Sequence, residues 1–464
     1  MKKLERRSFI KKSSQLGMTS LFGGVSILDS RAASPSPHAR TEWIRQNHVC
    51  QVKKETRIAC PSLGLAPVSH VQYIGRGLNR EERLSFMQSS DWHLMEIKRT
   101  SADNGSSWTP WKPIPISTQK SGKFTMSGGE SQMGSGPFDP ASGMLIKPVF
   151  QRIFDGDPTV ALSKLWKGER LFWDHGFYQL SDDNGQSWGP AHQLKYEGGP
   201  DFDESDWGRS DWLTRNEMYI GNAIVTSRGT VIISATVPVP HRDPEDEKYP
   251  SIFPNNYREG CVAGAMCFVG KWDAKNGVYK WQKSNSVFLP RKMSSRGLVE
   301  LHMGELANGH LLMIMRGSDT PQSPGRKWYS VSVDGGITWS PVTDMRYDNG
   351  EQLYSSASIH QIFRSSKNGK LYWVGNISEE PPKGNYPRYP LYIVEIDEKG
   401  PSFIKDTLTV IDTRDPEVDT DKVQMSNFSL LENRESREVE IYLTRLGENE
   451  NTWSANAYKY TLTF

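Results

Sequence analysis

The sequence predicts an all-β fold assembled from a repeated unit, and three observations point to it. One eight-residue pattern, S-x-D-x-G-x-x-W, occurs at residues 101–108, 181–188 and 332–339. Each copy follows a run in which apolar and polar residues alternate, as is typical of a half-buried strand. No stretch shows the spacing of a strong amphipathic helix. Within the pattern, Gly supplies the positive φ of a tight turn, and the Asp carboxylate can accept the turn's own N–H groups. Each copy therefore predicts a strand, a tight turn and a returning strand.

The three copies resemble the Asp-box of sialidase-like β-propellers, in which the box forms the turn between the third and fourth strands of a blade, away from the active site. The resemblance implies one propeller domain over residues 49–464, with six or seven blades that are four-stranded antiparallel sheets. The second and third copies are separated by nearly twice the spacing of the first two. A blade with a degenerate box is therefore expected between them, and residues 271–281 are the candidate.

The composition is that of an ordinary globular protein. The chain has 464 residues, of which 36% are hydrophobic and 24% charged, with a formal net charge of +2. This balance gives no reason to expect a nucleic-acid partner. The 15 Trp, 17 Tyr and 17 Phe residues can fill blade cores or stack on sugar rings. No run approaches the ~18 apolar residues of a membrane-spanning helix.

The N-terminal segment carries features of an export signal. Residues 6–11, Arg-Arg-Ser-Phe-Ile-Lys, resemble a twin-arginine signal, and a moderately apolar stretch follows at residues 16–28. Small residues at 30–33 offer a cleavage site. The sequence thus predicts a leader over residues 1–33, a linker over residues 34–48, and a bacterial protein that is periplasmic or secreted.

The cysteines and one Gly-rich segment lead to further expectations. Cys50 and Cys60, or Cys261 and Cys267, could pair in an oxidising compartment, or all four could remain thiols. Residues 117–148 are rich in Gly, Ser and Met, which predicts a long surface loop. No cofactor is expected, and the ligand spacing of a metal site is not evident, so metal binding stays open.

Glu300 and Arg316 are the first candidate pair for a functional site. Glu300 starts one predicted strand, a turn at residues 308–310 reverses the chain, and Arg316 ends the next strand. Both can therefore lie at one blade edge, where the carboxylate orients the guanidinium to clamp a substrate carboxylate. The segment resembles the sialidase pattern in which a Glu precedes a strand pair ending in one of three carboxylate-binding arginines.

The same resemblance implies two more substrate-binding arginines and one departure. Arg57, in Arg-Ile-Ala-Cys-Pro, matches a loosened form of the family's Arg-Ile-Pro motif, and Arg388, in Pro-Arg-Tyr-Pro, is a second candidate. Residues 427–431 stand where sialidases have the Tyr-Ser-x-Leu motif with the nucleophilic tyrosine, and Phe428 occupies that position. Because phenylalanine has no oxygen, the tyrosine-nucleophile mechanism is not expected.

Other groups must then carry the reaction. A neutral His can abstract a proton and a Tyr hydroxyl can donate one, so His175, Tyr219 and His360 are catalytic candidates. Such a set is similar to that of propeller-type polysaccharide lyases acting on ulvan-like uronic polysaccharides. Hydrolysis would instead use two carboxylates. The carboxylate candidates are Glu300, Glu305, Asp174 and Asp348, and Tyr354 and Tyr389 are candidates for substrate binding.

Three functions remain open on these residues. The leading one is an exo-acting glycoside hydrolase of sialidase-like type that removes a terminal, acidic or deoxy sugar from a poly- or oligosaccharide. The second is a polysaccharide lyase that cleaves uronic-acid polysaccharide by β-elimination. The third is a glycan-binding propeller without activity. A hydrolase needs two carboxylates, a lyase needs a His or Tyr base near an Arg, and a binding module needs neither.

Overall fold

The structure, a computed structural model, describes residues 42–44, 49–88, 93–114, 118–130, 136–165, 169, 171–248 and 260–464. The predicted leader lies outside the described residues, and so does most of the predicted linker. Nearly all of the described secondary structure is β-strand, as the sequence predicts.

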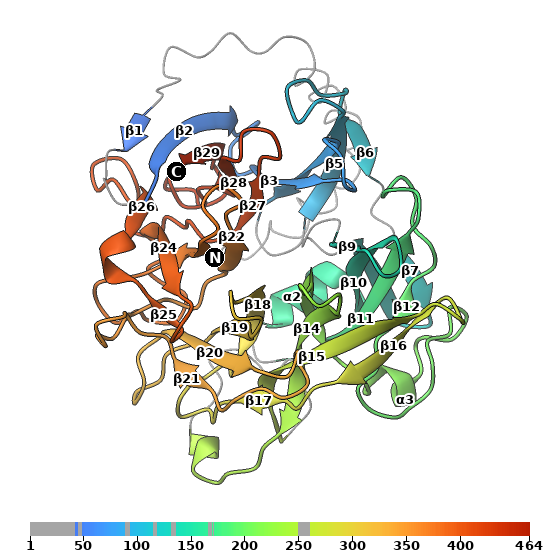
Figure 1. The fold of residues 1–464 in the computed structure, drawn as a ribbon. Helices are drawn as coiled ribbons and strands as arrows, with labels where there is room; N and C mark the ends of the chain where they lie inside the picture. Colours follow the sequence, from blue (N-terminus) through green and yellow to red (C-terminus); the bar gives the residue numbers. More distant parts are fainter. Residues whose placement is uncertain are drawn as a thin grey trace, which may run out of the picture.

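Six antiparallel sheets surround a central axis and form a six-bladed β-propeller (Figure 1). We number the blades 1 to 6 along the chain. Blade 1 holds β3 (Ala66–Tyr73), β4 (Arg80–Met87), β5 (His93–Ser101) and β6 (Lys112–Ile114); blade 2 holds β7 (Thr118–Ser121), β8 (Phe124–Glu130), β9 (Phe138–Asp139), β10 (Met144–Asp155), β11 (Phe172–Ser181) and β12 (His192–Gln193). Blade 3 holds β13 (Tyr219–Val225), β14 (Val231–Pro240), β15 (Cys261–Asp273), β16 (Val278–Lys283) and β17 (Val287–Phe288); blade 4 holds β18 (Val299–Glu305), β19 (Leu311–Arg316), β20 (Lys327–Ser332) and β21 (Thr343–Asp344). Blade 5 holds β22 (Gln361–Arg364), β23 (Leu371–Asn376), β24 (Leu391–Asp397), β25 (Ser402–Phe403) and β26 (Thr409–Asp412); blade 6 holds β27 (Phe428–Glu432), β28 (Val439–Thr444), β29 (Ala457–Thr463), β2 (Gln51–Ile58) and β1 (Glu42–Ile44).

The few helices lie in connections between strands. They are α2 (Pro158–Leu165), α3 (Ser210–Leu213) and two 3₁₀ turns, η1 (Asp246–Lys248) and η2 (Lys405–Thr407). None of these described helices has the length and apolar character that crossing a membrane requires.

Blade 6 closes the ring by joining the two ends of the chain. The N-terminal β2 pairs with the C-terminal β29 from Gln51 opposite Thr463 to Ile58 opposite Ala457, and Figure 1 shows the blue strand beside the red one. Apolar side chains fill the spaces between neighbouring blades, for example around Trp373 between blades 4 and 5. The core is therefore distributed around the ring, so every blade depends on its neighbours.

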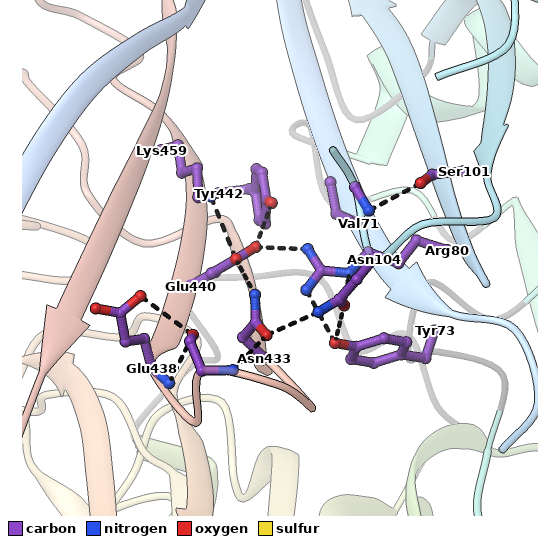
Figure 2. A network of polar contacts seen from close by, with 12 residues as sticks. Val71, Tyr73, Arg80, Ser101, Asn104, Asn433, Glu438, Glu440, Tyr442 and Lys459 are labelled. Carbon is purple, nitrogen blue, oxygen red and sulfur yellow. Dashed lines mark hydrogen bonds and ion pairs between the residues drawn. The ribbon is translucent and has the colours of Figure 1, made fainter. Parts of the chain in front are cut away.

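A buried polar network fastens blade 1 to blade 6 at this closure (Figure 2). Arg80, only 2% exposed, donates to Glu440 (2.8 Å), to Asn104 (2.9 Å) and to the Tyr73 hydroxyl (2.9 Å). The Glu440 carboxylate also accepts the Tyr442 hydroxyl (2.6 Å). Each of the three nitrogens of the Arg80 guanidinium therefore donates a hydrogen bond, as a stabilising buried ion pair requires.

The three S-x-D-x-G-x-x-W segments form the same turn between the third and fourth strands of blades 1, 2 and 4. In blade 2, Asp183 accepts the Ser181 hydroxyl (2.7 Å) and the Ser187 amide (2.9 Å), while Gly185 N donates to Ser181 Oγ (2.8 Å). The segment at residues 271–281 makes the corresponding β15–β16 turn of blade 3, with Lys275 N donating to Asp273 (3.1 Å). The blade expected between the second and third copies is confirmed.

The structure corrects the expected loop at residues 117–148 and decides between the two alternatives for the cysteines. Much of residues 117–148 is strand and not loop, because β7 and β8 form a hairpin around Gly122, whose φ is 55°, and β10 begins at Met144. All four cysteines are free thiols. Cys261 and Cys267 lie on one extended strand about 20 Å apart, far beyond the ~7 Å limit for the Cα atoms of a disulfide.

Candidate active site

One face of the propeller collects the starts of the first strands and the ends of the second strands. We call it the site face; the S-x-D-x-G-x-x-W turns lie on the opposite face, because successive strands of a blade are antiparallel. Tyr219 begins β13, Glu300 is the second residue of β18, and His360 directly precedes β22. All three therefore lie where first strands begin on the site face.

Hydrogen bonds between successive first strands set these residues at one level. Asn222 of β13 accepts Met303 N (2.9 Å), and Ile362 N donates to His302 Nδ1 (3.2 Å). Tyr219, Glu300 and His360 precede these bonded residues by two or three positions on their own strands. The structure thus places three of the catalytic candidates near the starts of neighbouring first strands, in three different blades.

A cavity of about 280 Å³ occupies the axis further along the same strands. First-strand residues of five blades line it, including His70, Asn222, His302, Gln361 and Ser429. Glu300 and Arg316 do not line this cavity. The candidate chemistry therefore sits at the mouth of the opening, above the cavity.

Glu300 and Arg316 form an ion pair, as the hairpin spacing predicts. Arg316 Nη1 donates to Glu300 Oε2, and the Glu300 side chain is 24% exposed against 7% for Arg316. Glu300 has a φ of 48° and lies in an irregularity of the β18–β19 register between Val299 and His302. A non-glycine residue in this region costs ~1–3 kcal/mol, and such strain concentrates at functional sites.

The charges around Glu300 keep its carboxylate ionised. Burial alone would raise the pKa of Glu300, but the positive charges of Arg316, Arg388 and Arg296 outweigh it, and the pKa falls below its ordinary value. Glu300 is therefore a carboxylate near neutral pH and is suited to act as a base, a nucleophile or a stabiliser of positive charge. It is not suited to donate a proton.

Arg316 retains donor capacity beyond its bond with Glu300. Its Nη2 makes one long contact, 3.4 Å, with the Asn385 amide oxygen, and its Nε has no hydrogen-bond partner among the described residues. A guanidinium oriented by one carboxylate can bind a second carboxylate with its other donors. Asn385 and Arg296 are residues that sequence reasoning missed, because neither belongs to the Glu300 hairpin.

Arg388 lies beside this pair but is held by the protein. Its guanidinium donates to Gln424 (2.9 Å), to Ser426 (3.2 Å) and to the carbonyl oxygens of Asn385 (3.1 Å) and Ala357 (3.2 Å). Arg388 thus ties blade 5 to the start of blade 6. Its charge still acts on Glu300.

The structure places Arg57 and Glu305 away from Glu300. Arg57 lies in an irregularity of β2, an outer strand, and forms an ion pair with Glu82 of blade 1 (2.8 Å). Glu305 ends β18 on the opposite face, about 16 Å along the strand from Glu300, where it accepts the Ser227 amide and hydroxyl (2.7 Å each). Most glycosidases use two carboxylates within roughly 5–10 Å of each other, so Glu305 is not the second carboxylate for Glu300.

The histidine candidates are buried. His175 has 0% exposure and is covered by Trp212, whose ring stacks on it at 4.0 Å. His360 is 2% exposed, with its Nε2 3.1 Å from the Ile314 carbonyl oxygen, so Nε2 carries the proton. Burial holds the pKa of His360 well below its usual range. His360 is therefore a neutral imidazole.

The remaining candidates are dispersed. Tyr354 is half-buried and pairs with Ser378, and Tyr389 packs against the core between blades 5 and 6. Phe428 belongs to the same core at 5% exposure. The carboxylates of Asp174 and Asp348 are also engaged, with Arg152 (2.7 Å) and Lys405 N (3.0 Å) respectively. Among the described residues, no group of three or more His, Cys, Asp or Glu side chains is placed to hold a metal ion.

We compared the chain with protein-family models, curated sequences and solved structures. No protein-family model matches the chain, and no curated protein matches its sequence. Among solved structures, a protein of unknown function from Dyadobacter fermentans is 13% identical, with a TM-score of 0.52, over 90% of this chain and 99% of that one. A mutant NanB sialidase from Streptococcus pneumoniae is 12% identical, with a TM-score of 0.53, over 93% of this chain and 71% of that one.

These likenesses, at such low identity, show the fold alone. The chain is a six-bladed β-propeller whose fold is similar to that of the NanB sialidase, and the propeller that the sequence resemblance implied is confirmed.

Proposed function

We propose that the protein is a carbohydrate-active enzyme, an exo-acting glycoside hydrolase of sialidase-like type that removes a terminal acidic sugar from a poly- or oligosaccharide. The observation that carries the proposal is the Glu300–Arg316 pair at the mouth of the central opening. The sialidase-like fold supports the same class of reaction.

The charge distribution favours an acidic sugar over a deoxy sugar. Three arginines, Arg316, Arg388 and Arg296, act electrostatically on Glu300. A substrate carboxylate would suit this positive environment and bind to Arg316 Nη2, whose contact with Asn385 is long. The ionised Glu300 would then stabilise the oxocarbenium-like transition state or activate water, and Tyr219, at the start of the neighbouring first strand, is the proposed proton donor to the leaving oxygen.

A uronic-acid lyase is the second candidate, supported by His360 and Tyr219 lying near the starts of the first strands that neighbour the strand of Glu300. A neutral His360 has the protonation state that a base requires. Its 2% exposure argues against contact with a polymer, and the buried His175 has the same difficulty. Hydrolysis at Glu300 is therefore preferred.

A glycan panel distinguishes the candidates. The mature protein is incubated with sialosides and with uronic-acid polysaccharides, and both reducing ends and the ultraviolet absorbance of unsaturated uronate are recorded. New reducing ends without that absorbance are expected from hydrolysis. Both signals together would replace the proposal with elimination, and binding without either would leave a glycan-binding module.

We also propose export to the periplasm or the cell exterior, on the basis of the twin-arginine-like residues 6–11. A fusion of residues 1–33 to a reporter should be exported. Replacing both Arg6 and Arg7 by Lys should keep the reporter in the cytoplasm.

A further inference from the structure

A buried lysine lies directly beside Arg316. In the β19–β20 register, Arg316 is paired with Lys327, and Lys327 has 0% exposure. Two cationic residues thus face each other on neighbouring strands, an arrangement that destabilises a sheet when both carry charge.

The contacts of Lys327 contain no counter-charge. Its Nζ donates to the carbonyl oxygens of Ser358 (2.6 Å) and Ser356 (3.2 Å). Within the described part of the chain, no carboxylate lies within ion-pair distance of Nζ. Two carbonyl acceptors match the two N–H donors of an uncharged amine.

The charged and titratable groups that face Lys327 come from every element around it. They are Arg316 on β19, Glu300 on β18, Arg388 before β24 and His360 before β22. Both arginines are permanently charged, and Glu300, the acid among these groups in the described part of the chain, already bonds to Arg316. Burial first, and then the charges of Arg316 and Arg388 against that of Glu300, hold the pKa of Lys327 well below its usual range.

We propose that Lys327 is a positioning residue of this site, an uncharged amine that fastens Ser356 and Ser358 behind Arg316 and takes up a proton from solvent when an anionic sugar binds to Arg316. The proton forms a new N–H bond on the amine lone pair, and the bound anion supplies the balancing charge. The proton uptake on ligand binding rests on the proposed function. The uncharged state of Lys327 and its hydrogen bonds to Ser356 and Ser358 are properties of the ligand-free protein and do not depend on that function.

The charge state is tested without ligand. Unfolding by urea is measured for the wild type and for Lys327→Met between about pH 7 and pH 9, below the unfolded-state pKa of ~10.4. The unfolded chain binds a proton that the folded chain lacks, so wild-type stability should rise with pH relative to the variant. The expected rise is up to about tenfold in the folding equilibrium constant per pH unit. A constant ratio would show a charged Lys327 and overturn the proposal.

A second variant, Lys327→Arg, tests the charge state independently of the pH series. Lys327→Arg introduces a permanent charge of similar reach. It should be less stable than Lys327→Met near neutral pH, because the buried charge has no partner. If Lys327→Arg is instead the more stable of the two, the site accepts a cation and the proposal fails.

Amide hydrogen exchange tests whether Lys327 holds the segment around Ser356 and Ser358 in place. Ser355 N and Ala357 N donate to the carbonyl oxygens of Gly325 and Gly384 (3.0 Å each), so their amides report on this segment. Loss of the two Lys327 bonds should speed their exchange by about tenfold. The control is Lys370→Met in the neighbouring blade 5, which removes the ion pair of an exposed lysine with Glu395, and there no change is expected. Unchanged exchange in Lys327→Met would rule out the fastening.

The coupling is measured by calorimetry with sialic acid and glucuronate as probes. Binding enthalpies in two buffers of different ionisation enthalpy should show an uptake approaching one proton in the wild type and none in Lys327→Met. Binding without uptake in the wild type would overturn the coupling. If neither acid binds, the proposed function and the coupling both fall, whereas the uncharged state and the fastening are decided by the first experiments.

Discussion

At the scale of single residues, Glu300 depends on its neighbours for both its backbone and its charge. Its left-handed φ is tolerated inside a sheet irregularity, and its ionised state is maintained by three arginines. In return, Glu300 neutralises Arg316, which is almost completely buried. The positive φ of Glu300 is an unfavourable backbone conformation for a non-glycine residue, and strain of this kind is typical of functional sites.

Glu300→Gln should therefore destabilise the protein even though the side chain keeps its size. We expect a loss of about 1.5–3 kcal/mol at neutral pH, the range for a hydrogen bond between charged groups. Because the folded pKa of Glu300 lies below its unfolded value, this stability is present above the unfolded pKa and disappears as pH falls through the folded pKa. Urea denaturation at neutral pH and at a series of acidic pH values below the unfolded-state pKa checks both statements. A difference between wild type and variant that stays the same throughout this series would contradict them.

At the scale of elements, the repeated turns and the site occupy opposite faces of the same sheets. The turns are local devices in which one Asp organises residues within four positions of itself. Hydrogen bonds from Ser187 and Ser181 hold the pKa of Asp183 at about 2. The turns therefore contribute to folding without taking part in the site.

Asp183→Asn should lower the melting temperature at neutral pH and leave activity unchanged. The folded pKa of about 2 lies below the ordinary value of 3.8, so the stabilisation is complete above that ordinary value and is lost as pH falls through about 2. Differential scanning calorimetry at neutral and acidic pH, with an activity assay at neutral pH, tests this prediction. A loss of activity in a folded variant would place the turn in the catalytic machinery.

At the scale of the whole molecule, closure of the ring joins residues from opposite ends of the chain. The Arg80–Glu440 pair spans 360 positions and is buried on both sides. Blades pack only on their neighbours, so an opened ring would expose two blade surfaces. The fold is therefore expected to unfold as one unit.

Arg80→Met should cost about 3–5 kcal/mol, because it leaves Glu440 buried with fewer partners. Lys98→Met is the matched control, since its ion pair with Glu81 is partly exposed and should contribute at most about 1 kcal/mol. Urea denaturation of both variants provides the comparison. If the two variants lose similar amounts of unfolding free energy, the buried network contributes no more to stability than a partly exposed ion pair.

The local parts of this structure could be predicted from the sequence, and the non-local parts could not. An eight-residue pattern encodes its own turn, and a hairpin brings Glu300 to Arg316 through a short chain segment. The environment of Arg57 depends on Glu82 of another blade, and that of Lys327 on carbonyl groups 29 and 31 positions away. Glu305 is close to Glu300 in sequence but far from it in space, because five positions along a strand separate the two faces of the propeller.

The Gly-rich composition of residues 117–148 concealed a hairpin for a similar reason. Glycine at a turn and glycine in a loop give the same composition, and only pairing with β10 distinguishes them. The number of blades likewise depends on how the sheets close, which no single repeat encodes.

The most direct test of the account compares product release by two variants, Glu300→Gln and Glu305→Gln, from an oligosaccharide that ends in an acidic sugar. These glutamates lie on one strand but at opposite faces, so each is the control for the other. Loss of charge at Glu300 should lower kcat/KM by about 100-fold or more, the effect of removing an electrostatic stabiliser of the transition state, while Glu305→Gln should keep its activity. Full activity in a folded Glu300→Gln variant would contradict a site built on the Glu300–Arg316 pair.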